Sequence, residues 1–147
     1  MTPSSLQSAI DRYADTLSGL ADPAARSQFL ISLGRGLPEP RSDQLTEERR
    51  LTGCQSRVWL WPAQRSSDAA MTFEGTSDSV LMCGILSIFF GIVDGARAAE
   101  IKLMDDDVIK RLGLDTFVAP GRGNGLRLIV ERLRSDASLL ASGVAYG

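Results

Sequence analysis

One stretch of this chain, residues 79–93, constrains the fold most because it is apolar nearly all round. Its large apolar side chains are Val80, Leu81, Ile85, Leu86, Ile88, Phe89, Phe90, Ile92 and Val93. A helix without a polar face has to be surrounded by other elements, so this stretch is predicted to be a central helix. Gly84, Ser87 and Gly91 lie three and four residues apart, which places them on one face where another element can approach closely.

Two helices are predicted near the N-terminus. The first covers residues 3–20 and carries apolar side chains at helical spacing, namely Leu6, Ile10, Tyr13, Leu17 and Leu20. The second begins at Asp22-Pro23, a capping residue followed by a proline at the first helical position. Gly34 and Gly36 are expected to terminate it, and the prolines that follow prevent its continuation.

The middle of the chain predicts an antiparallel hairpin. Residues 58–63 favour a strand that stops near its proline, and residues 71–74 alternate apolar and polar side chains as a half-buried strand does. The polar residues 65–68 between them indicate a turn, and a short connection joins antiparallel neighbours. Upstream, residues 41–50 are predicted to be a surface connection, with a short strand over 49–52.

Further helices are predicted after the central one. Residues 98–103 and 108–112 favour short helices, and three aspartates precede the second, where acids suit a helix N-terminus. Residues 120–125 indicate a glycine-rich loop, and residues 125–138 a last helix with one apolar face. Helices, then a hairpin, then more helices predict an α+β fold, with a small antiparallel sheet packed on one face by helices.

The chain of 147 residues is long enough for one domain with its own core. We expect a single domain over residues 1–147, with a core over about 5–138 and a mobile tail over 141–147. The formal net charge is −2 without a basic patch, which argues against nucleic acid as a partner. No apolar run approaches the roughly 20 residues of a membrane span, and the N-terminus has no signal-peptide pattern. We therefore expect a cytoplasmic protein that does not contact a membrane.

The chain contains two cysteines and no histidine. Without histidine, neither a Cys-His nor a Ser-His-Asp nucleophile can form within it, and a zinc site of three or four Cys/His ligands is impossible. We expect no metal and no bound cofactor. The spacing leaves a disulfide between Cys54 and Cys83 open, but nothing indicates an oxidising compartment, so reduced thiols are expected.

Cys54 is the candidate reactive group. It follows Gly53, which permits a sharp turn, and polar residues up to Arg57 separate it from the strand. A thiol at such a turn is presented to solvent and partners, whereas the alternative is a small buried hydrophobe at the start of a strand, and the residues leave both open. Arg57, or Arg122 in the glycine-rich loop, would favour the reactive thiolate if either lay near the sulfur.

Other candidates have simpler explanations. Cys83 lies in the apolar stretch and is more simply an inert packed thiol, although it could resolve Cys54 in a redox switch. The loop Gly121–Gly125 lacks the Lys-Ser/Thr of a phosphate loop and the spacing of a dinucleotide fingerprint, so it is predicted to lead into a helix and present one arginine. Asp78 and Asp105–Asp107 are most simply acids at helix N-termini.

The segment Gly53-Cys54-Gln55-Ser56-Arg57-Val58-Trp59-Leu60 resembles the cysteine motif of the SufE family of sulfur-acceptor proteins. Three further blocks resemble the family in the same order, namely Leu33-Gly34-x-x-Leu37-Pro38, Gly75-Thr76-Ser77-Asp78 and Pro120-Gly121-Arg122-Gly123-Asn124-Gly125-Leu126. The resemblance spans roughly residues 5–135. Two positions depart from it, since Cys83 stands where a basic residue is common and Thr76 where an aspartate is common.

The resemblance implies an α+β fold shared with IscU-type scaffold proteins. It implies that Cys54 accepts sulfur as a persulfide from a PLP-dependent cysteine desulfurase of the SufS type, that the protein stimulates this enzyme, and that it delivers sulfur to a SufBCD-type scaffold for Fe–S cluster assembly. Asp78 and Arg122 match family positions near the cysteine or its partner surface. A CsdA-like desulfurase is the alternative partner, and the protein could be a monomer or a homodimer. Two cysteines are too few ligands for building clusters itself.

Two rival functions stay open. One is a non-catalytic regulator that docks on a partner enzyme through the hairpin, with Cys54 only structural. Trp59 and Trp61 are expected on opposite faces of the strand, one in the core and one exposed as a contact surface. The other rival is a redox switch that uses Cys54 and Cys83 as its pair.

Overall fold

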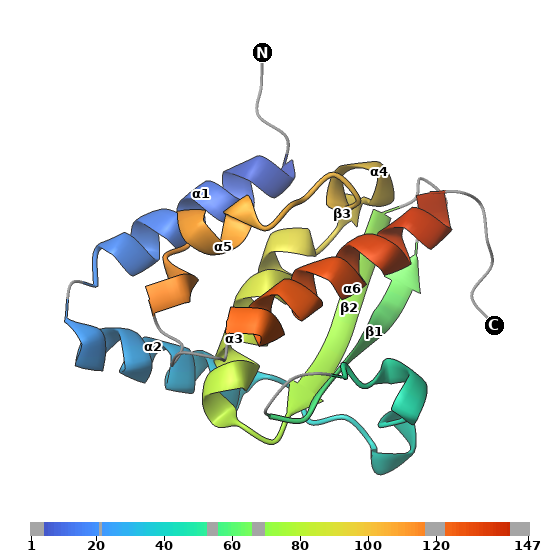
Figure 1. Ribbon diagram of the computed structural model, residues 1–147, viewed down its shortest axis with the longest axis horizontal. Coiled ribbons are helices and arrows are strands. Elements are labelled where there is room, and N and C mark those ends of the chain that lie inside the picture. Colours follow the sequence, from blue (N-terminus) through green and yellow to red (C-terminus); the bar gives the residue numbers. More distant parts are fainter. Residues whose placement is uncertain (1–4, 21, 53–55, 66–69, 117–122, 142–147) are drawn as a thin grey trace.

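The computed structural model describes residues 5–20, 22–52, 56–65, 70–116 and 123–141. The elements, in chain order, are α1 (Ser5–Ser18), α2 (Pro23–Gly36), η1 (Ser42–Gln44), η2 (Glu47–Arg49), β1 (Val58–Arg65), β2 (Ala70–Ser77), α3 (Val80–Val93), β3 (Ala96–Arg97), α4 (Ala98–Ile101), α5 (Asp107–Arg111), η3 (Leu114–Thr116) and α6 (Gly123–Ala141). Helices packed on a small antiparallel sheet confirm the predicted α+β fold (Figure 1).

The sheet has the strand order β1-β2-β3, and both pairs are antiparallel. The predicted hairpin is therefore confirmed, with Val58 opposite Ser77 at its start. The prediction that β1 stops near Pro62 is wrong, because the strand continues to Arg65 through a register shift between Pro62 and Gln64. Proline is tolerated here because β1 is an edge strand and a bulge absorbs the irregularity.

Helix α3 is the centre of the fold, as its apolar sequence predicts. It packs against α1, α2 and β2, and ten of its residues are buried, Phe89 and Ile88 completely. A Cβ on Gly91 would meet the phenol ring of Tyr13 on α1, so the small-residue face accepts neighbours as expected. Among the described residues, no helix combines the length and apolarity needed to span a membrane.

The crossing of α2 and α3 depends on two facing glycines. A Cβ on Gly34 would lie 2.9 Å from the Gly84 backbone nitrogen, and one on Gly84 would meet the backbone of Leu30. The second helix ends at Gly36, as predicted, but Gly34 does not help to end it, since α2 runs through that residue. Its lack of a side chain serves the close approach of the two helices instead. The start of this helix at Pro23, capped by Asp22, is as predicted.

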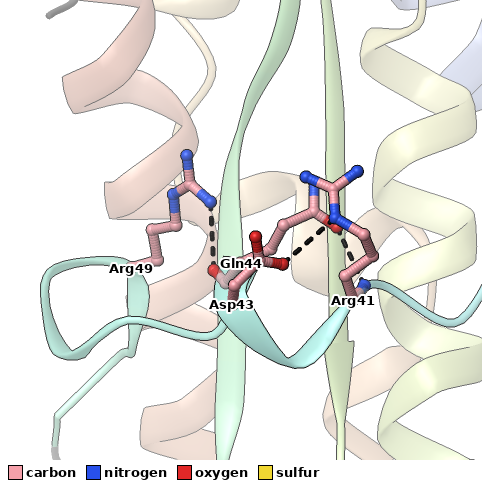
Figure 2. Close-up of polar contacts among 4 residues, drawn as sticks. All are labelled: Arg41, Asp43, Gln44 and Arg49. Carbon is pink, nitrogen blue, oxygen red and sulfur yellow. Dashed lines mark hydrogen bonds and ion pairs between the residues drawn. The ribbon is translucent and has the colours of Figure 1, made fainter.

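The segment between α2 and β1 is a surface connection, as predicted, since none of residues 41–50 is buried, and it forms the two 3-10 turns. The short strand predicted over 49–52 is wrong, because only an isolated bridge joins Arg50 to Trp59. Gln44 organises the segment: its side-chain oxygen accepts from the Arg41 N–H (2.9 Å), and its carbonyl accepts from Arg49 (3.0 Å) (Figure 2). Figure 2 shows this segment in front of the two long strands, with helices behind them, so it crosses the sheet face that the helices leave open.

The two tryptophans of β1 lie on this open face. The expectation that they point to opposite sides is wrong, because residues two apart in a strand share a face. Val58 and Leu60, in the alternate positions, are completely buried in the core. Trp61 is also buried, but under the crossing segment, with the Arg49 guanidinium 4.7 Å above its ring. Trp59 is half-buried, so neither ring is a freely exposed contact surface.

The last helix, α6, is longer than the predicted range 125–138, by two residues at its start and three at its end. Its apolar face of Leu126, Ile129, Val130 and Leu133 is completely buried, as its spacing predicts. Asp136 on the same helix is half-buried. Burial raises the pKa of its carboxyl from 3.8 to about 6, although the Arg132 guanidinium lowers it in part.

Asp136→Asn is expected to stabilise the protein at neutral pH. The folded state holds the proton more tightly than the unfolded state, so charging Asp136 costs stability as the pH rises from 3.8 to about 6, and the full cost applies above that range. Allowing for solvent screening at this half-buried site, the gain is about 1 kcal/mol. Urea unfolding of both proteins at pH about 7.5 and about 4 measures it, and the gain should vanish at the lower pH.

Asp115→Asn removes an exposed carboxylate and serves as the matched control. Its unfolding free energy should stay within about 0.5 kcal/mol of the wild type at either pH. An Asp136→Asn gain of equal size at both pH values would contradict the protonation argument.

Candidate functional site

The structure describes the residues on either side of the cysteine segment, which we define as residues 52–56. The Leu51 N–H donates to the Val58 carbonyl oxygen at 2.8 Å, next to the bridge between Arg50 and Trp59. Leu51 and Val58 are both buried, so this junction is rooted in the core. Cys54 lies between these ends in the sequence but outside the described residues.

The downstream end is clamped through the backbone of Arg57. Asp78 Oδ1 accepts a hydrogen bond from the Arg57 N–H (3.0 Å), and the Asp78 N–H donates to the Arg57 carbonyl (3.2 Å). Ser77 Oγ donates to that same carbonyl at 2.6 Å. Both backbone groups of Arg57 are thus held at the end of β2, three residues after Cys54.

This clamp corrects the predicted role of Asp78 as a helix N-terminal acid. The N-cap of α3 is Ser79, whose side chain accepts from the Met82 N–H (3.2 Å). In a longer antiparallel pair the Arg57 N–H would donate to a backbone carbonyl of the neighbouring strand, and here the side-chain oxygen of Asp78 takes the place of that carbonyl. The sequence places the cap among Thr76, Ser77 and Asp78, but the capping residue is the next one, Ser79, and α3 begins at Val80.

The guanidinium of Arg57 is exposed. Among the described residues it has neither an ion-pair nor a hydrogen-bond partner, while its backbone is fixed. An anchored backbone that carries an unengaged cation can offer positive charge to a nearby anion without first breaking another contact. Arg122, the other predicted cation, lies outside the described residues.

Arg132 on α6 holds the upstream end. It donates to the carbonyl oxygens of Glu48 (3.0 Å) and Arg50 (3.5 Å), just before the cysteine segment. A hollow of about 210 Å³ lies beside this contact, lined by Leu51, Thr52, Leu128, Glu131, Arg132 and Ser135. Sequence reasoning missed Arg132, because 82 residues separate it from Arg50 and no local pattern links them.

The second thiol, Cys83, is free and buried, with 8% of its surface exposed. It points at the end of β2, where its Sγ donates to the Ser77 carbonyl (3.4 Å) and lies 3.8 Å from Thr76 Oγ1. The prediction of a packed thiol on the central helix is confirmed. Through Ser77, this thiol also touches the residue that holds Arg57.

The remaining predicted positions do not join this site. Asp105 accepts from the Asp107 N–H (2.9 Å), and Asp106 pairs with Arg127 on α6 (3.2 Å). Within the described ranges, no group of three acidic or thiol side chains is placed to hold a metal ion. The glycine-rich segment is helical from Gly123 onward, so the predicted loop is shorter at that end than expected.

The family model named SufE, an Fe-S metabolism associated domain, matches residues 11–137. The chain belongs to the SufE family. That domain links this SufE-family protein to Fe–S metabolism, in agreement with a role in accepting sulfur.

Related sequences carry the same family name. An uncharacterized SufE-like protein of Rhizobium meliloti is 34% identical over 131 residues, which cover 87% of this chain and 94% of the relative. A SufE-like protein of Haemophilus influenzae is 30% identical over 111 residues, covering 75% of this chain and 87% of the relative. The solution structure of a hypothetical protein from Thermus thermophilus is 17% identical, matches with a TM-score of 0.72, and covers 97% of this chain and 99% of that protein, so it shows the same fold.

Proposed function

We propose that this SufE-family protein is a sulfur carrier whose acceptor is Cys54. It takes sulfur from a SufS-type cysteine desulfurase, stimulates that enzyme, and delivers the sulfur to a SufBCD-type scaffold for Fe–S cluster assembly. The observation that supports this most is the family match across residues 11–137, which includes Cys54. The clamped flanks of Cys54 support it further.

The chemistry is a thiol exchange without net oxidation. The Cys54 thiolate attacks the outer sulfur of the donor persulfide, a new S–S bond forms to Cys54, and the donor S–S bond breaks. The donor leaves as a thiolate, so atoms and electrons balance without a metal or a bound cofactor. A nearby cation such as Arg57 or Arg122 would stabilise the attacking thiolate.

A desulfurase with isotopically labelled cysteine tests the proposal. After incubation and non-reducing digestion, the labelled sulfur is expected on the peptide that contains Cys54, and a reductant should release it. Label confined to the Cys83 peptide, or absent from both, would contradict the proposal. The buried position of Cys83 supports the expectation, because a thiol with 8% exposure offers little access to a donor enzyme.

The clamp on Arg57 predicts an effect of Asp78 that is separate from its charge. Asp78→Ala leaves the Arg57 N–H without its acceptor and should reduce the initial rate of sulfur acceptance about tenfold, with a loss of about 1 kcal/mol in stability. Asp78→Asn keeps an oxygen at the same place, so it should retain most of the rate. The measurement is label transfer per minute at saturating desulfurase, beside the alkylation rate of Cys54.

If Asp78→Asn is as slow as Asp78→Ala, the negative charge matters rather than the backbone clamp. Ser79→Ala is the matched control, because it removes a cap of the neighbouring helix without touching Arg57. It should cost about 1 kcal/mol of stability while the transfer rate stays near that of the wild type.

A further inference from the structure

The edge of β2 that faces away from β1 is only partly paired. β3 covers it at Ala70 and Met71, and the Gly95 N–H donates to the Met71 carbonyl (2.8 Å). Because the backbone groups of a strand alternate between its two edges, those of Phe73 and Gly75 point to the same side as those of Met71. Within the described part of the chain, no backbone hydrogen bond satisfies Phe73 or Gly75 on that side.

A groove of about 480 Å³ runs along this open edge. One wall is the chain that follows α2, residues 37–44, and the other is Phe73–Gly75. The rings of Phe73 and Phe90 are buried at its base, with 6% and 9% of their surfaces exposed. Its volume falls within the range of roughly 300–1,000 Å³ that is usual for ligand sites.

The facing wall does not compete for the open edge. It contains Pro38 and Pro40, which have no N–H group to donate, and the described structure has no hydrogen bond from this wall to β2. Buried backbone groups need a partner, so a groove with unpaired N–H and C=O groups favours an occupant that offers both. A peptide in extended conformation does so, and it also presents alternate side chains to the aromatic base.

The charges at the rim indicate which side chains such a peptide carries. Glu39 and Glu74 are exposed at the groove, and among the described residues neither carboxylate has an ion-pair or hydrogen-bond partner. Arg41, which also lines the groove, is engaged with Asp43 at 3.1 Å. The unbalanced charge at the groove is therefore negative and complements a basic side chain.

We propose that this groove binds an extended, basic segment of a partner protein, which adds as a strand to the open edge of β2. The backbone of the segment pairs with Phe73 and Gly75, an apolar side chain contacts Phe73 and Phe90, and a lysine or arginine reaches Glu39 or Glu74. Strand addition of this kind takes its affinity from backbone hydrogen bonds and its selectivity from alternate side chains.

The test uses a short synthetic peptide in which valine alternates with lysine and arginine, titrated into the wild-type protein. Saturable binding with a Kd on the order of 100 µM is expected, with amide NMR shifts at residues 73–77 and 37–44. The same peptide N-methylated at alternate backbone nitrogens should bind at least about tenfold more weakly, because it cannot pair with an edge. A counterpart with glutamate in place of the basic residues should not bind.

A Glu39→Gln and Glu74→Gln double variant should lower the affinity for the basic peptide about tenfold. The matched control is Glu48→Gln with Asp115→Asn, which removes two exposed carboxylates away from the groove. No saturable binding up to about 1 mM, equal binding of the N-methylated peptide, or shifts outside the groove would overturn the proposal. So would a protein that dimerises through residues 73–77. The assay contains no desulfurase, so its outcome is independent of the proposed sulfur transfer.

Discussion

Replacing Gly84 with alanine is expected to lower the free energy of unfolding by about 3 kcal/mol, the upper part of the usual range for overpacking. The new Cβ would lie 2.7 Å from the carbonyl carbon of Leu30, well inside van der Waals contact. Leu30 is completely buried, and the clash is with its backbone, so no side-chain rotation relieves it. Helix α2 would have to move away from α3, and the tight packing between them would be lost.

Urea unfolding measures this effect, with Gly36→Ala as the matched control. A Cβ on Gly36 meets nothing within 4 Å, although Gly36 belongs to the same pair of helices. That variant should be neutral or stabilising by about 0.5 kcal/mol, because alanine restricts the unfolded chain. Similar unfolding free energies for both variants would show that the two helices do not meet as closely as the structure has them.

Replacing Cys54 with serine is expected to abolish sulfur acceptance. A serine hydroxyl cannot form a stable persulfide, and the chain has only one other thiol. The measurement is the labelled sulfur bound per protein molecule after incubation with the desulfurase, which should fall to background. A Cys54→Ser protein that still stimulates the desulfurase fully would favour the rival function of a non-catalytic regulator.

Cys83→Ser is the matched control for that loss. Cys83 is buried, and a serine hydroxyl can keep the hydrogen bond that its thiol donates to the Ser77 carbonyl. Most of the acceptance should therefore remain. Equal loss in both variants would overturn the assignment of roles and favour a two-cysteine mechanism, which intact mass after mild oxidation would reveal as a loss of two hydrogens.

Local patterns in the sequence were enough for the helices and the hairpin. In α1 and α6 the spacing of apolar residues predicts which face of the helix is buried, and in α3 the absence of a polar face predicts burial all round. Both patterns can be read from residues that are close together in the sequence. Gly84 and Gly91 could be recognised as contact points for the same reason, since their spacing lies within one helix. The family resemblance likewise rests on short contiguous motifs around Cys54 and Asp78.

The tertiary structure decided what depends on residues far apart in the chain. Asp78 could serve a helix or a strand, and the choice follows from the position of Arg57, 21 residues away. Arg132 and the crossing segment over Trp61 are likewise set by contacts that no local pattern encodes.

The central helix and the cysteine motif could therefore be recognised from the sequence alone, because periodicity and contiguous motifs are local properties. The clamp on Arg57, the facing glycines of α2 and α3, and the open edge of β2 became visible only in the fold. The clamp and the facing glycines join segments that lie far apart in the chain, and the open edge exists because β3 pairs only with Ala70 and Met71. The sequence of one segment does not say which other segment it meets.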